Sequence, residues 1–289
     1  MPSQRSKKWE SDPMAVIETT GTSGAAAAAA PSSRRLFSVR GLVEIGFLVG
    51  LAIIYNLVRA GGGAAHEIAG KTHARHIVDA EGWFFDKVEL GINHWIAGVT
   101  VLAVAACYFY ALMHYVATPV VLLVSRKKGG WKYWRGYWAL VLACAIALVS
   151  YANFPVAPPR LLSGDGAIDI MRQFSQYGWW GDAASAPRGL GDATNQYAAM
   201  PSLHFGWSLW CGIQMWGFGS KKWKIAAVAY PTLQALVVIA TANHFGLDVL
   251  GGAVCTLLSF GIVTVVGRAL GKTGPKAKAK QELEDAVAA

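Results

Sequence analysis

The sequence is poor in charge, and in acidic residues above all. Only 15% of the 289 residues are charged, and 17 Asp and Glu stand against 26 Lys and Arg. A soluble domain carries charge on about a quarter of its residues, whereas 54% of this chain is hydrophobic and falls in long blocks. This shortage excludes a soluble globular domain and predicts an all-α polytopic membrane protein.

Cysteines and internal repeats are also scarce. The four cysteines lie inside apolar blocks without CxxC spacing, which argues against a disulfide framework or a cysteine-bound metal. The lack of internal repeats argues against a transporter built from inverted halves. The formal charge of +9 favours contact with lipid head groups over nucleic acid, because the basic residues cluster at the ends of the apolar blocks.

The apolar blocks predict a bundle of six transmembrane helices, since about 20 apolar residues cross a bilayer. The predicted spans cover residues 40–59, 96–124, 136–154, 201–218, 223–242 and 245–270. They form one catalytic membrane domain, residues 39–271. Residues 1–38 are expected to be a disordered cytoplasmic tail and residues 272–289 a basic cytoplasmic tail.

The distribution of basic residues predicts the orientation. With both termini in the cytoplasm, 19 of the 26 Lys and Arg fall on the cytoplasmic side. The sequence therefore predicts a multi-pass protein of the cell membrane whose loop 161–200 lies outside.

Residues 64–95, between the first two predicted spans, mix apolar and charged residues at helical spacing. We expect an amphipathic segment on the outer membrane surface. His66, His73, His76 and His94 lie in or beside it, and a metal cluster is the alternative to solvated surface histidines. Ligand spacing favours the surface histidines, so no metal is expected.

Two polar motifs stand at the starts of predicted spans. The first is NQYAAMPSLHFGW at residues 195–207, and the second is ANHFGLD at residues 242–248. About forty residues separate His204 from His244, enough for one span down and one back. The two motifs are therefore predicted to meet at the outer face.

These residue types suit phosphoryl transfer. Asp248 follows His244 by four residues, so the two would share a helix face if the helix has begun there. The carboxylate would fix the tautomer and leave the other ring nitrogen of His244 to act as a nucleophile. His204 would protonate the leaving oxygen. The non-catalytic alternative for either histidine, taken alone, is a packing residue at the membrane interface.

Five further residues are candidates for binding phosphate. Arg160 follows a PVAPP stretch that ends a predicted span, and its guanidinium forms paired hydrogen bonds to phosphoryl oxygens. Ser202 precedes a predicted helix whose free N–H groups attract anions, although a serine there is also a common N-cap. Asn195 is a weaker candidate, with Arg172 and Arg188. Arg160 by itself could simply anchor the chain to lipid phosphate.

At this point the sequence resembles a known family. PSLH and NHFGLD are similar to the second and third signature motifs of the type 2 phosphatidic acid phosphatase superfamily. The NFPVAPPR stretch resembles the branch of inositol phosphorylceramide synthases and their bacterial relatives. The resemblance implies six membrane helices, a nucleophilic His244 oriented by Asp248, and His204 as general acid. It also implies lipid phosphate, lipid pyrophosphate or phospholipid substrates, without a cofactor.

The chain departs from the phosphatase motifs at several positions. Leu203 stands where PSGH has glycine, as in the synthase branch. Val238 stands where the third motif has arginine. Lys128 and Arg135 echo the first motif, but Gly136 replaces its proline, and the predicted topology puts them on the cytoplasmic side.

The predicted function is therefore a lipid-phosphate phosphatase or phosphotransferase that works through a phosphohistidine at the outer leaflet. A head-group transferase of the inositol phosphorylceramide synthase type is the alternative within the family. A metal-dependent membrane hydrolase using His204, His244 and Asp248 as ligands, and a non-catalytic transporter, are the alternatives outside it.

Overall fold

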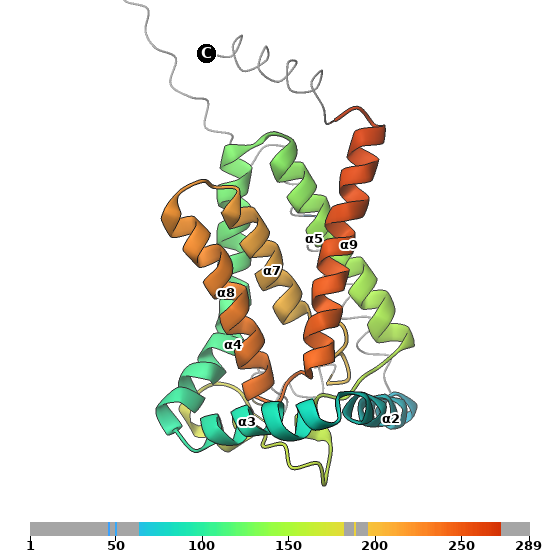
Figure 1. Cartoon of the computed structure of the whole chain (residues 1–289), viewed down its shortest axis with the longest axis vertical. Helices are drawn as coiled ribbons and strands as arrows, with labels where there is room; N and C mark the ends of the chain where they lie inside the picture. The colour runs from blue at the N-terminus through green and yellow to red at the C-terminus, as the bar shows by residue number, and fades with distance from the viewer. Residues whose placement is uncertain (1–45, 47–49, 51–63, 182–187, 189–195, 273–289) are drawn as a thin grey trace, which may run out of the picture.

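The computed structural model describes residues 46, 50, 64–181, 188 and 196–272, and every regular element in these residues is a helix. Long helices form a bundle, and α2 (Ala64–Glu81) and α3 (Leu90–Ala97) lie across one end of it (Figure 1). The bundle consists of α4 (Thr100–Lys128), α5 (Gly130–Asn153), α7 (Leu203–Trp216), α8 (Lys221–Ala240) and α9 (Gly246–Ala269). The prediction of an all-α fold is confirmed.

Four helices in the described part of the chain are long and apolar enough to cross a membrane, namely α4, α5, α8 and α9. The predicted fourth span is shorter than expected, because α7 has 14 residues. At about 1.5 Å per residue it is roughly 21 Å long, less than the ~30 Å hydrocarbon core. The predicted first span, 40–59, lies outside the described residues.

Helices α3 and α4 end at glycines and not where the apolar blocks of the sequence end. The prediction joined residues 96–124, but the chain breaks between α3 and α4, where Gly98 ends one helix and Val99 is extended. At its other end α4 continues through the basic residues to Lys128 and stops at Gly129, whose φ is +64°. A positive φ costs glycine little, so glycine ends a helix readily.

The segment from residue 64 to residue 97 is not one continuous α-helix. A π-helical turn, Phe85–Glu89, stands between α2 and α3. This turn directs Phe85 and Glu89 inward, where both are buried, while Trp83 and Phe84 stay exposed. The turn matters because Glu89 reaches the start of α9.

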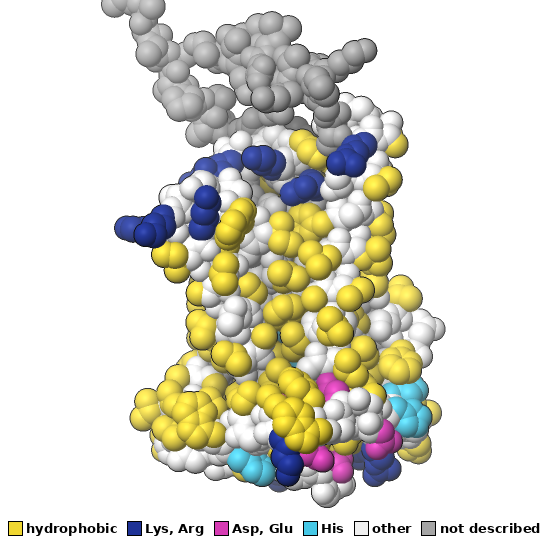
Figure 2. Space-filling model, in the orientation of Figure 1, with side chains coloured by type: hydrophobic (Ala, Val, Ile, Leu, Met, Phe, Trp, Pro, Cys, Tyr) yellow, Lys and Arg dark blue, Asp and Glu magenta, His cyan; other side chains and the backbone are white. Residues whose placement is uncertain are grey.

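The two ends of the bundle differ in charge. Lys and Arg side chains gather at the end opposite α2 and α3 (Figure 2). They belong to the last turn of α4, the start of α5, the start of α8 and the last turn of α9. Acidic and histidine side chains appear at the other end, near α2 and α3. Lys128 and Arg135 therefore lie far from the histidine motifs.

Candidate active site

A short extended stretch after α5 joins the two histidine motifs. Val156 donates its N–H to the Tyr197 carbonyl at 2.8 Å and accepts from the Ala199 N–H at 3.2 Å. Four residues later, the Arg160 N–H donates to the Ala242 carbonyl at 3.0 Å. Adjacent prolines keep this stretch out of an α-helix, and it ends in a single 3-10 turn, Pro159–Leu161, so its backbone is free to pair with both loops. The NFPVAPPR stretch thus positions the segments that precede His204 and His244.

His244 lies just before α9 and not within it. The helix begins only at Gly246, so the condition for a helix face shared by His244 and Asp248 is not met. A turn brings the two side chains together instead, and His244 Nδ1 lies 3.5 Å from Asp248 Oδ2. The Val238 carbonyl supports this turn by accepting from the Asn243 and His244 N–H groups at 3.1 and 3.2 Å. Val238, where the family motif has arginine, is buried.

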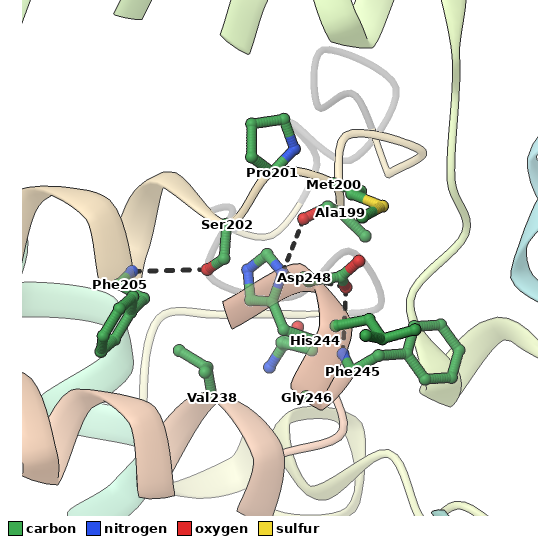
Figure 3. A network of polar contacts seen from close by, with 12 residues as sticks. Ala199, Met200, Pro201, Ser202, Phe205, Val238, His244, Phe245, Gly246 and Asp248 are labelled. Atoms are coloured by element: carbon green, nitrogen blue, oxygen red, sulfur yellow. Dashed lines mark hydrogen bonds and ion pairs between the residues drawn. The ribbon is translucent and has the colours of Figure 1, made fainter. Parts of the chain in front are cut away.

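The hydrogen bond of His244 determines its tautomer. Nδ1 lies 3.0 Å from the Ala199 carbonyl oxygen (Figure 3), which can only accept. Nδ1 must therefore carry a proton, and in the neutral ring Nε2 carries the lone pair. Sequence reasoning missed Ala199, because a backbone carbonyl leaves no signal in the residue pattern.

Asp248 is fully buried in the first turn of α9. Its Oδ2 accepts from the Phe245 N–H at 3.0 Å, and its backbone carbonyl accepts from the Ser202 N–H at 2.9 Å. Oδ1 has no hydrogen-bond partner among the described residues. Asp248 therefore caps its helix, links the two motifs and places a carboxylate beside His244.

His204 stands in the first turn of α7, with its ring centroid 5.6 Å from that of His244. Tyr110 of α4 stacks on this ring at 4.3 Å, and His114 meets it edge-on at 4.6 Å. The prediction overlooked both α4 residues. A histidine such as His114 inside a long apolar block was the available signal, since ionisable groups in spans are rare and usually functional.

Ser202 is the N-cap of α7. Its Oγ accepts from the Phe205 N–H at 3.4 Å, and the residue is fully buried. The N-cap role is the structural alternative that the sequence offered for this serine. The hydroxyl can still donate its own O–H to another group. Ser202 lies beside His244 and Asp248 (Figure 3).

The Arg160 side chain lies next to the His244 turn and is only 2% exposed. Its Nε donates to Asn243 Oδ1 at 3.0 Å, and both terminal nitrogens donate to Gln196 Oε1, at 3.3 and 3.2 Å. One terminal nitrogen also lies 3.4 Å from Asp169 Oδ2. The arginine is therefore near the site, but protein groups already engage its guanidinium.

The remaining candidates divide as follows. Asn195 lies outside the described residues. Arg188 binds backbone carbonyls, with Nε donating to Trp180 at 3.4 Å and a terminal nitrogen donating to Ser175 and Gly178. Arg172 lies in the same short helix that Asp169 caps. Neither arginine is joined to the histidines by the contacts described above.

The histidines of residues 64–95 have structural roles. His66 and His73 bond to the carbonyls of Tyr151 and Pro155, at 3.3 and 2.7 Å, and His94 bonds to that of Gly166 at 2.7 Å. The prediction of solvated surface histidines therefore holds for His94, which is exposed, whereas His66 and His73 are partly buried because α2 lies against the end of the bundle. Within the described residues no group of His, Cys, Asp and Glu is arranged to hold a metal ion.

Comparison with known families gives one match. A family model described as the PAP2 superfamily matches residues 75–262, a range that contains both histidine motifs and the stretch that joins them. No curated protein and no solved structure matched the chain. Because the match covers well over half of the sequence, this chain belongs to the PAP2 superfamily.

Proposed function

We propose that this protein is an integral membrane phosphatase or phosphotransferase that acts on a lipid-linked phosphate through a phosphohistidine at His244. Membership of the PAP2 superfamily suggests the reaction class. The observation that carries the proposal is the bond from His244 Nδ1 to the Ala199 carbonyl, since it leaves the Nε2 lone pair for the substrate. Nucleophilic catalysis by an oriented histidine is an established route for such transfers.

In the first half-reaction, Nε2 attacks phosphorus and the P–O bond to the lipid breaks. His204 gives the departing oxygen a proton, and the positive charge on the phosphorylated ring faces Asp248 at 3.5 Å. In the second half-reaction, water or an alcohol returns a proton to His204 as its oxygen replaces Nε2 on phosphorus. His244 is then restored with the same tautomer.

Arg160 is the proposed phosphate ligand. Its Nε donates to the Asn243 side chain and its backbone N–H donates to the Ala242 carbonyl, so it is bonded to the turn that carries His244. In the sequence, 84 positions separate Arg160 from that histidine. A phosphoryl group would replace Gln196 on the guanidinium, which suits paired hydrogen bonds. The Ser202 hydroxyl and Asn195 are proposed as secondary contacts.

The proposed placement has six spans, with the first span and α7 added to the four apolar helices. Both termini are cytoplasmic, the active site lies at the outer leaflet, and α2 and α3 rest on the outer surface. The positive-inside rule supports this orientation, because the basic end of the bundle is opposite the histidines.

The acceptor in the second half-reaction distinguishes a phosphatase from a transferase. PSLH and the NFPVAPPR stretch are similar to the inositol phosphorylceramide synthase branch, so head-group transfer is the second candidate. The deciding experiment gives the purified protein a panel of labelled lipid phosphates and phospholipids, with and without inositol as acceptor alcohol. Released inorganic phosphate indicates hydrolysis, and a new phosphodiester indicates transfer. Loss of turnover with a chelator, restored by added metal, would favour a metal-dependent hydrolase instead.

A further inference from the structure

Two glutamates from the segment that crosses the end of the bundle hold the start of α9. Glu89 Oε1 accepts from the Gly246 N–H at 2.6 Å. Glu81 Oε1 accepts from the Leu247 N–H, also at 2.6 Å. Free N–H groups at a helix start prefer negatively charged partners. Both contacts lie within three residues of His244, so α2 and the π-helical turn hold the backbone that directly follows the proposed nucleophile.

Gly246 shows how closely the two carboxyl groups approach. A Cβ on this residue would lie 2.8 Å from Glu89 Oε1 and 3.3 Å from Glu81 Oε1. Any other residue at position 246 would therefore displace the Glu89 carboxyl group. The glycine of NHFGLD makes room for this pair.

Glu89 is buried and Glu81 is partly buried, and their Oε1 atoms approach the same point beside Gly246. Glu89 is 3% exposed, and the Oε2 atoms of both glutamates are buried without a partner among the described residues. Two ionised carboxylates offer no donor to each other, whereas one shared proton supplies it. Unpartnered buried oxygens are costly, so the geometry favours one proton on the pair.

The acidity of the pair is consistent with this arrangement. Burial, followed by the neighbouring Glu81, raises the pKa of Glu89 to about 8. Burial also raises the pKa of Glu81. The titratable groups that act on the pair are its own members, from α2 and the π-helical turn, and Asp248 of α9. All three are acidic, so a second ionisation places like charges together.

We propose that Glu81 and Glu89 are positioning residues that share one proton and hold the first turn of α9, and with it His244 and Asp248, in the reactive arrangement. The role rests on the function proposed for His244. It also gives residues 64–97 a purpose beyond contact with the membrane surface.

The proposal fixes the direction of the pH dependence. The folded protein keeps a proton that the unfolded chain loses near the ordinary pKa of 4.5. The stabilising effect of that proton is therefore fully present below pH 4.5 and is lost as the pH rises through about 8. Above that value the repelling carboxylates should loosen the start of α9, and kcat should fall more than KM changes.

The test compares Glu89→Gln, Glu89→Ala and the control Glu67→Gln. Glutamine keeps the acceptor for Gly246 and supplies a permanent donor to Glu81, so Glu89→Gln should lose at most about threefold in kcat near neutral pH. The fall in kcat at alkaline pH should be smaller in Glu89→Gln than in the wild-type protein. Glu89→Ala leaves the Gly246 N–H unpaired and should lower kcat by about 10- to 100-fold. Glu67 forms an exposed ion pair with Lys71 within α2, so Glu67→Gln should leave the dependence of kcat on pH unaltered.

A second readout keeps this proposal separate from the proposed function. The melting temperature of the wild-type protein should fall relative to that of Glu89→Gln as the pH rises from about 6 to about 9, whether or not any lipid phosphate is turned over. If neither the wild-type protein nor any variant has activity, the proposed function fails, and the melting curves alone decide on the shared proton. Equal melting curves overturn the proposal. An inactive but folded Glu89→Gln, or an unchanged alkaline decline in that variant, also overturns it.

Discussion

His244 is held from two sides at the level of single residues. The Ala199 carbonyl fixes which nitrogen carries the proton, and Asp248 faces the same nitrogen from the first turn of α9. Asp248 also accepts from the Phe245 N–H, so it shapes the turn as well as the charge around the ring. The two roles predict different consequences for the two side chains.

His244→Ala should abolish turnover and the acid-labile phosphoenzyme, because no other side chain replaces Nε2. Asp248→Asn should keep a residual rate, since the Ala199 carbonyl still selects the tautomer while the countercharge is lost. Rapid-quench labelling with a radioactive lipid phosphate measures both variants, and the melting temperature controls for folding. Wild-type labelling of His244→Ala would rule out this residue as the nucleophile.

Arg160→Lys should lower kcat/KM by about 10- to 100-fold, because an ammonium group cannot form the paired bonds of a guanidinium. Arg135→Lys is the matched control, since Arg135 lies at the basic end and its guanidinium packs over Phe260. It should leave kcat/KM nearly unchanged. The opposite pattern would make the Lys128 and Arg135 echo of the first family motif the phosphate site.

The sequence predicted the candidate site residues whose side-chain type itself suggests catalysis. His204, His244 and Asp248 stood out because ionisable groups at the starts of apolar blocks are unusual. Ala199 and the capping role of Glu81 and Glu89 were not predictable, since they depend on a carbonyl and on contacts between segments far apart in sequence. The family resemblance identified the histidines but not what holds them.

Among the elements, α7 lies between α8 and α9 and depends on glycine. A Cβ at Gly212 would lie 2.5 Å from the Ala227 carbonyl of α8, and one at Gly252 of α9 would lie 2.4 Å from the Ser202 carbonyl. Small residues let membrane helices approach this closely. The four helices that could cross a membrane were predictable from apolar length, whereas their ends are set by glycine and by capping residues that a hydropathy average ignores.

Gly212→Ala should destabilise the protein by about 1–3 kcal/mol, because the new methyl group forces α7 away from α8. Gly261→Ala is the control, since nothing lies within 4 Å of a Cβ there. Thermal unfolding in one detergent compares the two variants directly. Equal melting temperatures would mean that α7 and α8 do not pack this closely.

The molecule as a whole has one basic end and one end that carries the histidines (Figure 2). Charge bias in the sequence predicted this separation, because basic residues follow alternate spans. The predicted topology also put residues 64–95 at the face of the histidine motifs, but it did not predict which contacts hold α2 and α3 against the bundle there. Their placement depends on carbonyl contacts such as those of His66 and His73.

The proposed orientation predicts which surface positions an impermeant thiol reagent reaches. The four native cysteines are all buried, so they should add little background. Ser163→Cys, exposed at the histidine end, should react in intact cells. Lys222→Cys, exposed at the basic end, should react only after the membrane is permeabilised. The reverse pattern would place the active site in the cytoplasm.

The engaged state of Arg160 has a consequence for the catalytic cycle. Its guanidinium already has Gln196 and Asp169 as partners, so a phosphoryl group bound there as proposed would have to displace them. The same partners would return to Arg160 when the product leaves. Their competition would weaken substrate binding and speed product release. A site built in this way favours rapid turnover over tight retention of either ligand. Inorganic phosphate should accordingly be a weak inhibitor.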